Sequence, residues 1–334
     1  MNTINGKRIS LFLIATEGRK TTFRVIRNFI KLSDCDFFVV SHDAPNIRNF
    51  VSEINMEMDR KILYIEASNN SVCQKRNLAL LMSIANGYDY CILSDDDIVF
   101  EDILDIYRLV KLFEALPKEC SVLSPTLELA GTPVYGGLLY RNGTFMSLET
   151  QPAGSIWYSL CPSAAFIAVR VKSIARMFEV GLRPFEELFV IQSEDVDFAV
   201  KVWLLGYKIA CTKLVKVKHL ATRSQIPSWR LFFMYRNRLL LLLLNFSVRH
   251  VLFYLPFRVL NDVFQNIVVF HGHNFSSLVK AYSWTLKNLS TIIIQRNHRR
   301  KAFRRTEKML FTKLPLPARA LGSQIAFKRS QAKM

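Results

Sequence analysis

The chain has 334 residues, of which half are hydrophobic and 22% are charged, and this composition excludes a disordered or low-complexity protein. Its 45 lysine and arginine residues exceed its 27 acidic residues, and the formal net charge of +18 favours an anionic partner: nucleic acid, membrane lipid or a phosphorylated small molecule. Residues 225–334 hold 19 of the basic residues and two of the acidic ones, whereas residues 1–224 are almost balanced. This shift predicts two regions, residues 1–225 and residues 226–334.

The first 125 residues alternate strand-like and helix-like patterns. Strands are expected at residues 8–16, 36–41, 62–65 and 88–93, and helices at about residues 20–32, 71–86 and 101–115. Ser71 followed by Gln74 is typical of a helix-capping box, and Gly87 of a helix C-terminus. The β-α-β-α order predicts an α/β fold with a mostly parallel central sheet and helices on both faces.

Later segments are less regular. Residues 126–192 are rich in Gly, Pro and aromatic residues, which is typical of substrate-binding loops. A helix is expected from Ser193 to Gly206, with Asp197 and Lys201 spaced to form an ion pair. Two short strands are expected at residues 208–212 and 215–219.

Polar residues stand where the expected strands end: Thr16, Asp43 and the run Asp95-Asp96-Asp97. Ligands bind parallel sheets beyond the carboxyl ends of the strands, so these are site candidates by position. Three adjacent carboxylates repel one another, and a divalent cation removes that repulsion, as in a metal–diphosphate clamp. The alternative is a solvated acidic turn that caps the following helix.

Two further motifs are ambiguous when each is taken alone. Glu194 and Asp195 open a helix, where acidic residues also complement the helix dipole. His219 ends a strand, where a histidine is either a metal ligand or a structural or exposed side chain.

Together these motifs resemble a known family. The order of Thr16, Asp43, Arg76-Asn77, Gly87-Tyr88-Asp89-Tyr90 and Asp95-Asp96-Asp97 resembles a GT-A fold glycosyltransferase of family 2. Glu194-Asp195-Val196-Asp197, followed by Gly206-Tyr207 and His219, is particularly similar to the rhamnosyl- and galactofuranosyltransferase branch. The resemblance covers about residues 8–245 and implies a Rossmann-like nucleotide-sugar-binding catalytic domain at residues 1–225.

The resemblance also implies roles for these residues. It gives Asp195 as general base with Glu194 beside it, and Asp97 and His219 as ligands of Mn²⁺ or Mg²⁺. Residues that contact the nucleotide-diphosphate-sugar donor are implied at five positions: Thr16, Asp43, Arg76, Asp95 and Asp96.

Elementary chemistry agrees with this division of roles. Displacing a nucleoside diphosphate needs its developing negative charge neutralised, which a bound cation does, and the acceptor hydroxyl needs a base. In-line attack inverts the anomeric centre, so we expect an inverting glycosyltransferase that moves a hexosyl or deoxyhexosyl group. The expected acceptor is a glycan, lipid-linked, in cell-surface polysaccharide biosynthesis. Trp157 and Tyr158 either stack on that acceptor or belong to the core.

Residues 226–334 are basic, leucine-rich and aromatic, which predicts amphipathic helices that associate with an anionic membrane surface. An ordinary helical subdomain with a basic end is the alternative, and no nucleic-acid-binding module is visible. The scattered cysteines favour a reducing compartment, and no apolar run reaches the length of a membrane span. We therefore expect a cytoplasmic protein, peripheral on the inner face of the plasma membrane.

Two other functional classes fit parts of the sequence. A non-enzymatic polyanion-binding protein would use its acidic triplet only as a helix cap. A nucleotidyltransferase on a similar sheet would release pyrophosphate and would give Asp195 and His219 no joint role.

Overall fold

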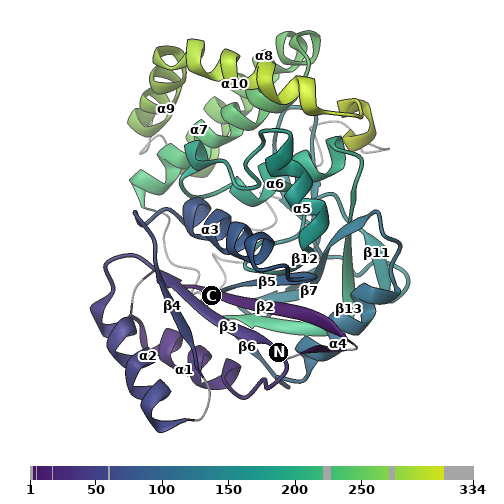
Figure 1. Cartoon of the computed structure of the whole chain (residues 1–334). Helices are drawn as coiled ribbons and strands as arrows, with labels where there is room; N and C mark the ends of the chain where they lie inside the picture. Colours follow the sequence, from purple (N-terminus) through teal and green to yellow (C-terminus); the bar gives the residue numbers. More distant parts are fainter. Residues whose placement is uncertain are drawn as a thin grey trace. The chain divides into compact units, whose positions relative to one another are not determined.

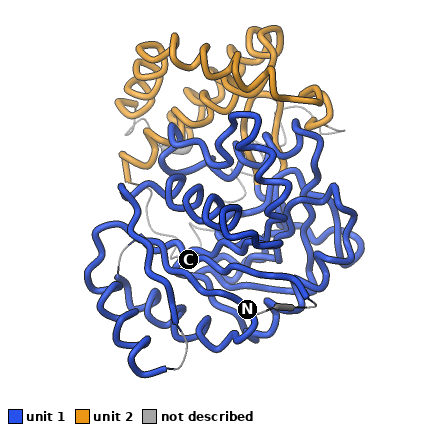
Figure 2. The backbone as a smooth tube through the Cα atoms, viewed as in Figure 1, with its two compact units in different colours: residues 1–137, 147–224 blue, residues 138–146, 225–334 orange. Residues whose placement is uncertain are grey.

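The chain folds into two compact units, shown in different colours in Figure 2. The computed structural model describes residues 3–4, 6–16, 18–58, 61–220, 227–270 and 275–311. The first unit contains residues 1–137 and 147–224, and the second contains residues 138–146 and 225–334. Residues 138–146 belong to the second unit although they lie far from it in sequence.

A mixed β-sheet forms the centre of the first unit. Among the described residues its strand order is β11-β13-β7-β12-β5-β2-β3-β4. Strands β4, β3, β2 and β5 run parallel, whereas β12 runs antiparallel to both β5 and β7. The path is formed by β2 (Lys7–Ile14), β3 (Asp36–Ser41), β4 (Leu63–Glu66), β5 (Tyr90–Asp95), β7 (Cys120–Leu129), β11 (Ile156–Tyr158), β12 (Phe166–Arg170) and β13 (Lys208–His219). Shorter strands of this sheet are β1 (Thr3–Ile4), β6 (Ile98–Phe100) and β8 (Thr132–Val134). Strands β9 (Gly137–Leu139) and β10 (Phe145–Ser147) pair with each other in a separate two-stranded sheet.

Helices cover both faces of this sheet, as the sequence predicts (Figure 1). Alternate residues of β2 face opposite sides: Leu11 and Leu13 enter the core formed with α1, α2 and α4, whereas Ser10 Oγ contacts Ser83 Oγ of α3 at 2.9 Å. Helix α5 packs against α3 on that second side. The helices of this unit are α1 (Lys20–Phe29), α2 (Pro45–Glu57), α3 (Val72–Ala85), α4 (Asp105–Ala115), α5 (Val171–Glu179), the 3₁₀ turn η1 (Glu187–Phe189) and α6 (Glu194–Leu204).

Three local expectations were wrong in detail. Residues 98–100 form strand β6, so helix α4 begins at Asp105 rather than near residue 101. The two short strands expected at residues 208–219 are one strand, β13, whose register shifts between Thr212 and Lys216. Ser71 is the N-cap of α3, but its side chain makes no capping hydrogen bond, and the Gln74 side chain bonds to the Asn69 backbone N–H and to Ser68.

The second unit is helical, as expected for the C-terminal region. It contains α7 (Ser228–Asn245), α8 (Val248–Phe270), α9 (Phe275–Lys287), α10 (Leu289–Ala302) and the 3₁₀ turn η2 (Glu307–Phe311). Tyr235 and Leu231 of α7 pack with Leu278 and Ala281 of α9 in its apolar core. Within the described residues, no helix is both long enough and apolar enough to cross a membrane.

The buried side chains include one ion pair that the sequence predicted. All six cysteines are buried and none forms a disulfide. Asp197 and Lys201 of α6 form the predicted i,i+4 ion pair, with Nζ and Oδ2 2.6 Å apart, and the pair is fully buried. Lys201 Nζ also donates to the Arg183 carbonyl at 2.8 Å, which fixes α6 to the loop before it.

The buried ion pair predicts an asymmetric effect of substitution. Lys201→Met removes the cation that balances the Asp197 carboxylate, so we expect it to lower the free energy of unfolding by about 3–5 kcal/mol. The double variant Asp197→Leu/Lys201→Met removes both charges, and we expect it to recover more than half of that loss. Urea unfolding followed by circular dichroism measures both, and a double variant less stable than Lys201→Met would contradict the prediction.

Candidate active site

A cavity of about 380 Å³ opens at the carboxyl ends of β2 and β3. The parallel arrangement of these strands brings their ends to one edge of the sheet, where Thr16 follows β2 and Asp43 follows β3. Both were candidates from the sequence. The lining residues are Thr16, Gly18, His42, Asp43, Ala44, Pro45, Asn46 and Asn70.

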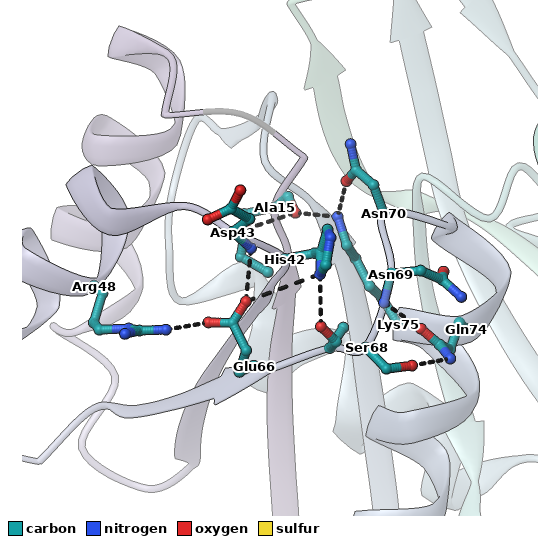
Figure 3. A network of polar contacts seen from close by, with 12 residues as sticks. Ala15, His42, Asp43, Arg48, Glu66, Ser68, Asn69, Asn70, Gln74 and Lys75 are labelled. Carbon is teal, nitrogen blue, oxygen red and sulfur yellow. Dashed lines mark hydrogen bonds and ion pairs between the residues drawn. The ribbon is translucent and has the colours of Figure 1, made fainter.

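Glu66 holds the loop on one side of the cavity (Figure 3). Its carboxylate accepts a 2.6 Å bond from the Asp43 backbone N–H and also bonds to Arg48 and to the Tyr64 hydroxyl. These bonds, the Asp43 bond foremost, hold the pKa of Glu66 below its usual range. The backbone of Asp43 has a positive φ of 46°, a conformation that Asp tolerates better than most residues. The Glu66 carboxylate stabilises this turn through its bond to the Asp43 N–H, and Asp43 lines the cavity.

Lys75 of α3 supports the other side of the cavity. Its Nζ is buried and donates to the Ala15 carbonyl at 2.8 Å and to Asn70 Oδ1 at 2.6 Å, as Figure 3 shows. Burial lowers the pKa of Lys75 to about 8, although the charges of Asp96 and Glu66 oppose the shift. The end of β2 and the Asn70 loop are therefore joined through one buried amine.

Asp96 is fixed beneath the loop after β2. Its Oδ2 accepts bonds from the Thr22 hydroxyl at 2.8 Å and from the Thr16 backbone N–H at 3.3 Å. Burial raises the pKa of Asp96 to about 6, and these two bonds limit the shift. Asp96 thus connects the acidic triplet to the cavity edge at Thr16.

Asp97 and His219 lie together, although 122 positions separate them in the sequence. Strand β13 runs antiparallel to β6, which sets His219 opposite Ile98, and Asp97 Oδ1 lies 3.0 Å from His219 Nε2. Burial lowers the pKa of His219, because it disfavours the charged imidazole. The hydrogen bond and charge of Asp97, together with the charges of Asp95 and Asp96, outweigh burial, so the pKa of His219 is raised overall.

One carboxylate oxygen and one imidazole nitrogen suit Mn²⁺ or Mg²⁺ when a substrate supplies further oxygens. Asp97 Oδ1 is buried and lies 3.0 Å from His219 Nε2, so the two atoms are close enough to bind one cation together. Within the described parts of the chain, however, no group of three or more His, Cys, Asp or Glu side chains is arranged to hold a metal. Asp97 and His219 would therefore be the two ligands that the protein itself supplies to a metal ion at this place.

Arg76 of α3 joins the two acidic motifs. Its buried guanidinium lies 2.8 Å from Asp95 Oδ1 and 3.2 Å from Glu194 Oε1. It also lies over the ring of Phe185, with 5.3 Å between the guanidinium carbon and the ring centroid. Arg76 therefore brings the end of β5 and the start of α6 to one place in the first unit.

The acidic pair Glu194-Asp195 begins α6 in a desolvated environment. Burial and the neighbouring Asp195 charge raise the pKa of Glu194 to about 7, with Arg76 opposing the shift. Burial likewise raises the pKa of Asp195, again opposed by Arg76. Both carboxyl groups are therefore poised closer to neutral pH than ordinary acids.

The chain before this pair is strained. Val190, Gln192 and Ser193 have φ values of 61°, 67° and 62°, in a region that costs non-glycine residues roughly 1–3 kcal/mol each. Such strain persists only where surrounding contacts impose it, and it concentrates at functional sites. It supports a functional role for the start of α6.

Of these contributors, Lys75 was not identified from the sequence, and Arg76 and Asn77 were identified only through the family resemblance. Lys75, Arg76 and Asn77 are all buried, although three consecutive polar residues on a helix usually indicate a solvated face. Asn77 exchanges two hydrogen bonds with the Phe185 backbone, at 2.6 and 3.0 Å. The only sequence signal for this group was Arg76-Asn77 in the family resemblance.

Comparison with known proteins gives the fold. No family model and no curated protein sequence matches this chain. Among solved structures, GalNAc-T7 in a crystal structure with UDP, GalNAc and Mn²⁺ aligns with a TM-score of 0.54 and 13% sequence identity. The alignment covers 70% of this chain and 48% of GalNAc-T7, so this chain spans about half of that protein. The fold is GT-A-like.

A second structure covers more of the chain at lower similarity. Mannosyltransferase PcManGT from Pyrobaculum calidifontis, in complex with GDP-Man and Mn²⁺, has a TM-score of 0.46 and 10% identity over 89% of this chain and 86% of its own. At 13% sequence identity, the similarity to GalNAc-T7 establishes only the fold. The similarity to PcManGT is too low to support any further conclusion.

The raised pKa of Glu194 predicts a pH-dependent stability effect. A carboxyl whose pKa is higher in the folded than in the unfolded protein destabilises the fold progressively as pH rises from about 4.5 through about 7. Glu194→Gln removes this charge, so we expect it to stabilise the protein by about 1–3 kcal/mol at pH 8 and to have little effect at pH 4. Urea unfolding at both pH values measures the difference, and destabilisation at pH 8 would contradict it.

Proposed function

We propose that the protein is a metal-dependent inverting glycosyltransferase that moves a sugar from a nucleotide-diphosphate-sugar to a glycan acceptor. The observation that carries this proposal is Arg76, which joins Asp95 at the end of β5 to Glu194 at the start of α6. A GT-A-like fold supports the same reading. The arrangement supplies one acidic cluster for the donor and a second for the acceptor.

The donor nucleotide is proposed to occupy the cavity at the ends of β2 and β3. Thr16, Asp43 and Asn70 line it and offer both hydrogen-bond donors and acceptors to a base and ribose. Asp96 connects the Thr16 edge to the acidic triplet, so the diphosphate would extend from the cavity toward Asp95 and Asp97. The presence of UDP, GalNAc and Mn²⁺ in GalNAc-T7 is consistent with such a donor.

Asp97 and His219 are the residues proposed to hold Mn²⁺ or Mg²⁺, with diphosphate oxygens as further ligands. When bound, the cation neutralises the negative charge that develops on the departing nucleoside diphosphate. The chain's own contribution is to hold these two side chains close together through the β13–β6 pairing.

Asp195 is proposed as the general base, with Glu194 held beside it by Arg76. A base acts best when its pKa lies near the working pH, and burial shifts Asp195 in that direction. It would take the proton of the acceptor hydroxyl as that oxygen attacks the anomeric carbon opposite the leaving diphosphate. One in-line displacement of this kind inverts the configuration.

The acceptor is proposed to be a glycan, lipid-linked, in cell-surface polysaccharide biosynthesis at an anionic membrane. Support comes from the second unit, whose sequence carries most of the net positive charge. Tyr158 is half-exposed, and the neighbouring Trp157 donates its Nε1–H to the Tyr135 carbonyl at 3.0 Å. Stacking of an acceptor sugar on Tyr158 stays a prediction.

Asp97→Asn tests the metal-dependent chemistry. We expect it to lower Mn²⁺-dependent release of nucleoside diphosphate by at least about 100-fold, because a neutral amide binds the cation far less well. A screen of nucleotide-sugars with a coupled diphosphate assay first identifies the donor. Asp102→Asn makes the same chemical change at an exposed position and serves as the matched control. Release of pyrophosphate would contradict the proposal. Release of nucleoside diphosphate that needs no metal and is unchanged in Asp97→Asn would contradict it as well.

Asp195→Asn tests the base. We expect transfer to an acceptor to fall by about 100- to 10,000-fold, because the amide cannot take the hydroxyl proton. Binding of nucleoside diphosphate with Mn²⁺, measured by isothermal titration calorimetry, should stay within about threefold of the unsubstituted protein. Full transfer activity in Asp195→Asn would exclude this residue as the base.

A further inference from the structure

Helix α8 of the second unit has its polarity reversed relative to a helix of a water-soluble domain. The side of α8 that faces solvent is apolar, with a single charged residue, Arg249, near its start. Leu252, Phe253, Phe257, Leu260, Phe264, Ile267 and Val268 are each 40–69% exposed and recur at helical spacing along one face. A contiguous apolar surface of this kind marks an interaction site.

The polar residues of α8 lie on its inner side. Arg258 and Asp262 are fully buried and form an ion pair, in which Arg258 Nε donates to Asp262 Oδ2 at 3.0 Å. Arg258 also donates to Thr144 Oγ1 at 2.7 Å, and the Tyr282 hydroxyl donates to Asp262 Oδ2 at 2.9 Å. Rotating α8 to hide its apolar face would break these bonds and strand a buried charge, so the outward apolar face is fixed.

The charges of the second unit indicate what covers this face. Its only two carboxylates by sequence are Asp262, which is buried, and Glu307, which is also buried and lies 3.0 Å from Arg300. Among the described residues of this unit, the exposed charged side chains are therefore all cationic: Arg141, Arg230, Arg249, Lys280, Lys287, Lys301, Arg304 and Lys308. A second copy would bring the same positive charges and be repelled, whereas an anionic lipid surface would be attracted.

We propose that the outer face of α8 inserts into the surface of an anionic bilayer, with the helix lying in the membrane plane. The 23 residues of α8 would extend for about 34 Å, but the buried Arg258 and Asp262 and the absence of a spanning helix among the described residues favour lying on the surface over crossing it. This inference names the element that meets the proposed membrane partner. It does not depend on the sugar-transfer chemistry.

Vesicle flotation of the full chain tests the proposal. We expect binding to vesicles of phosphatidylcholine with phosphatidylglycerol, and at least about tenfold weaker partitioning for Leu252→Ser/Leu260→Ser, since each change removes roughly a buried leucine side chain from lipid contact. Met56→Ser/Leu81→Ser, two exposed apolar residues of the first unit, is the matched control and should bind as the unsubstituted chain does. Equal binding of the α8 variant and the control would overturn the proposal.

A spin label on α8 separates insertion from self-association. All six native cysteines are buried, so a label on Leu260→Cys attaches selectively. We expect its accessibility to oxygen to rise, relative to a water-soluble nickel reagent, when anionic vesicles are added, and a label on Met56→Cys to show no such change. Dipolar broadening between Leu260→Cys labels without vesicles would indicate a second copy on this face and would overturn the proposal. Neither vesicle flotation nor spin-label accessibility measures enzyme activity. The membrane proposal can therefore be tested even if the protein is not a transferase.

Discussion

The buried guanidinium of Arg76 is the interaction on which the candidate site depends. The carboxylate of Glu194 is buried and that of Asp95 is partly buried, and without a cation between them they would repel each other in a medium of low polarity. Arg76 balances both charges and so permits the end of β5 and the start of α6 to meet. Asn77, the next residue, bonds to the Phe185 backbone and fixes the segment that leads to α6.

The site is assembled by topology as well as by charge. The parallel order of β2, β3 and β5 places Thr16, Asp43 and Asp95 along one edge of the sheet. The antiparallel pairing of β13 with β6 brings His219 to Asp97. Strain at Val190, Gln192 and Ser193 shows that the start of α6 is held in a conformation its backbone does not prefer. Charge, pairing and strain thus act on one region of the first unit.

Much of this arrangement could be predicted from local patterns in the sequence. Strand β3 begins and ends where its run of apolar residues predicted, and the α/β fold followed from the alternation of elements. The motif residues were predicted as candidates because they stand at strand ends or open a helix. The sequence predicted two strands where the structure has the single strand β13, because the register shift of β13 interrupts its alternation of apolar residues.

Features set by distant contacts could not be predicted in this way. Lys75 is polar on a helix and reads as solvated, yet its amine satisfies the Ala15 carbonyl and Asn70 inside the protein. The hydrogen bond of Glu66 to Asp43 joins residues 23 positions apart and has no local signature. Helix α8 shows the same limit, because the sequence predicts an amphipathic helix and only the buried Arg258–Asp262 pair shows that its polar side faces inward.

The most direct test of the account is the rate of metal-dependent nucleoside diphosphate release by Arg76→Met, measured with the donor that the screen identifies. If Arg76 holds the two acidic clusters in one active centre, kcat should fall by about 100-fold or more. The affinity for nucleoside diphosphate should change little, because the cavity at Thr16, Asp43 and Asn70 is lined by other residues. An unchanged kcat in a folded Arg76→Met protein would contradict the account.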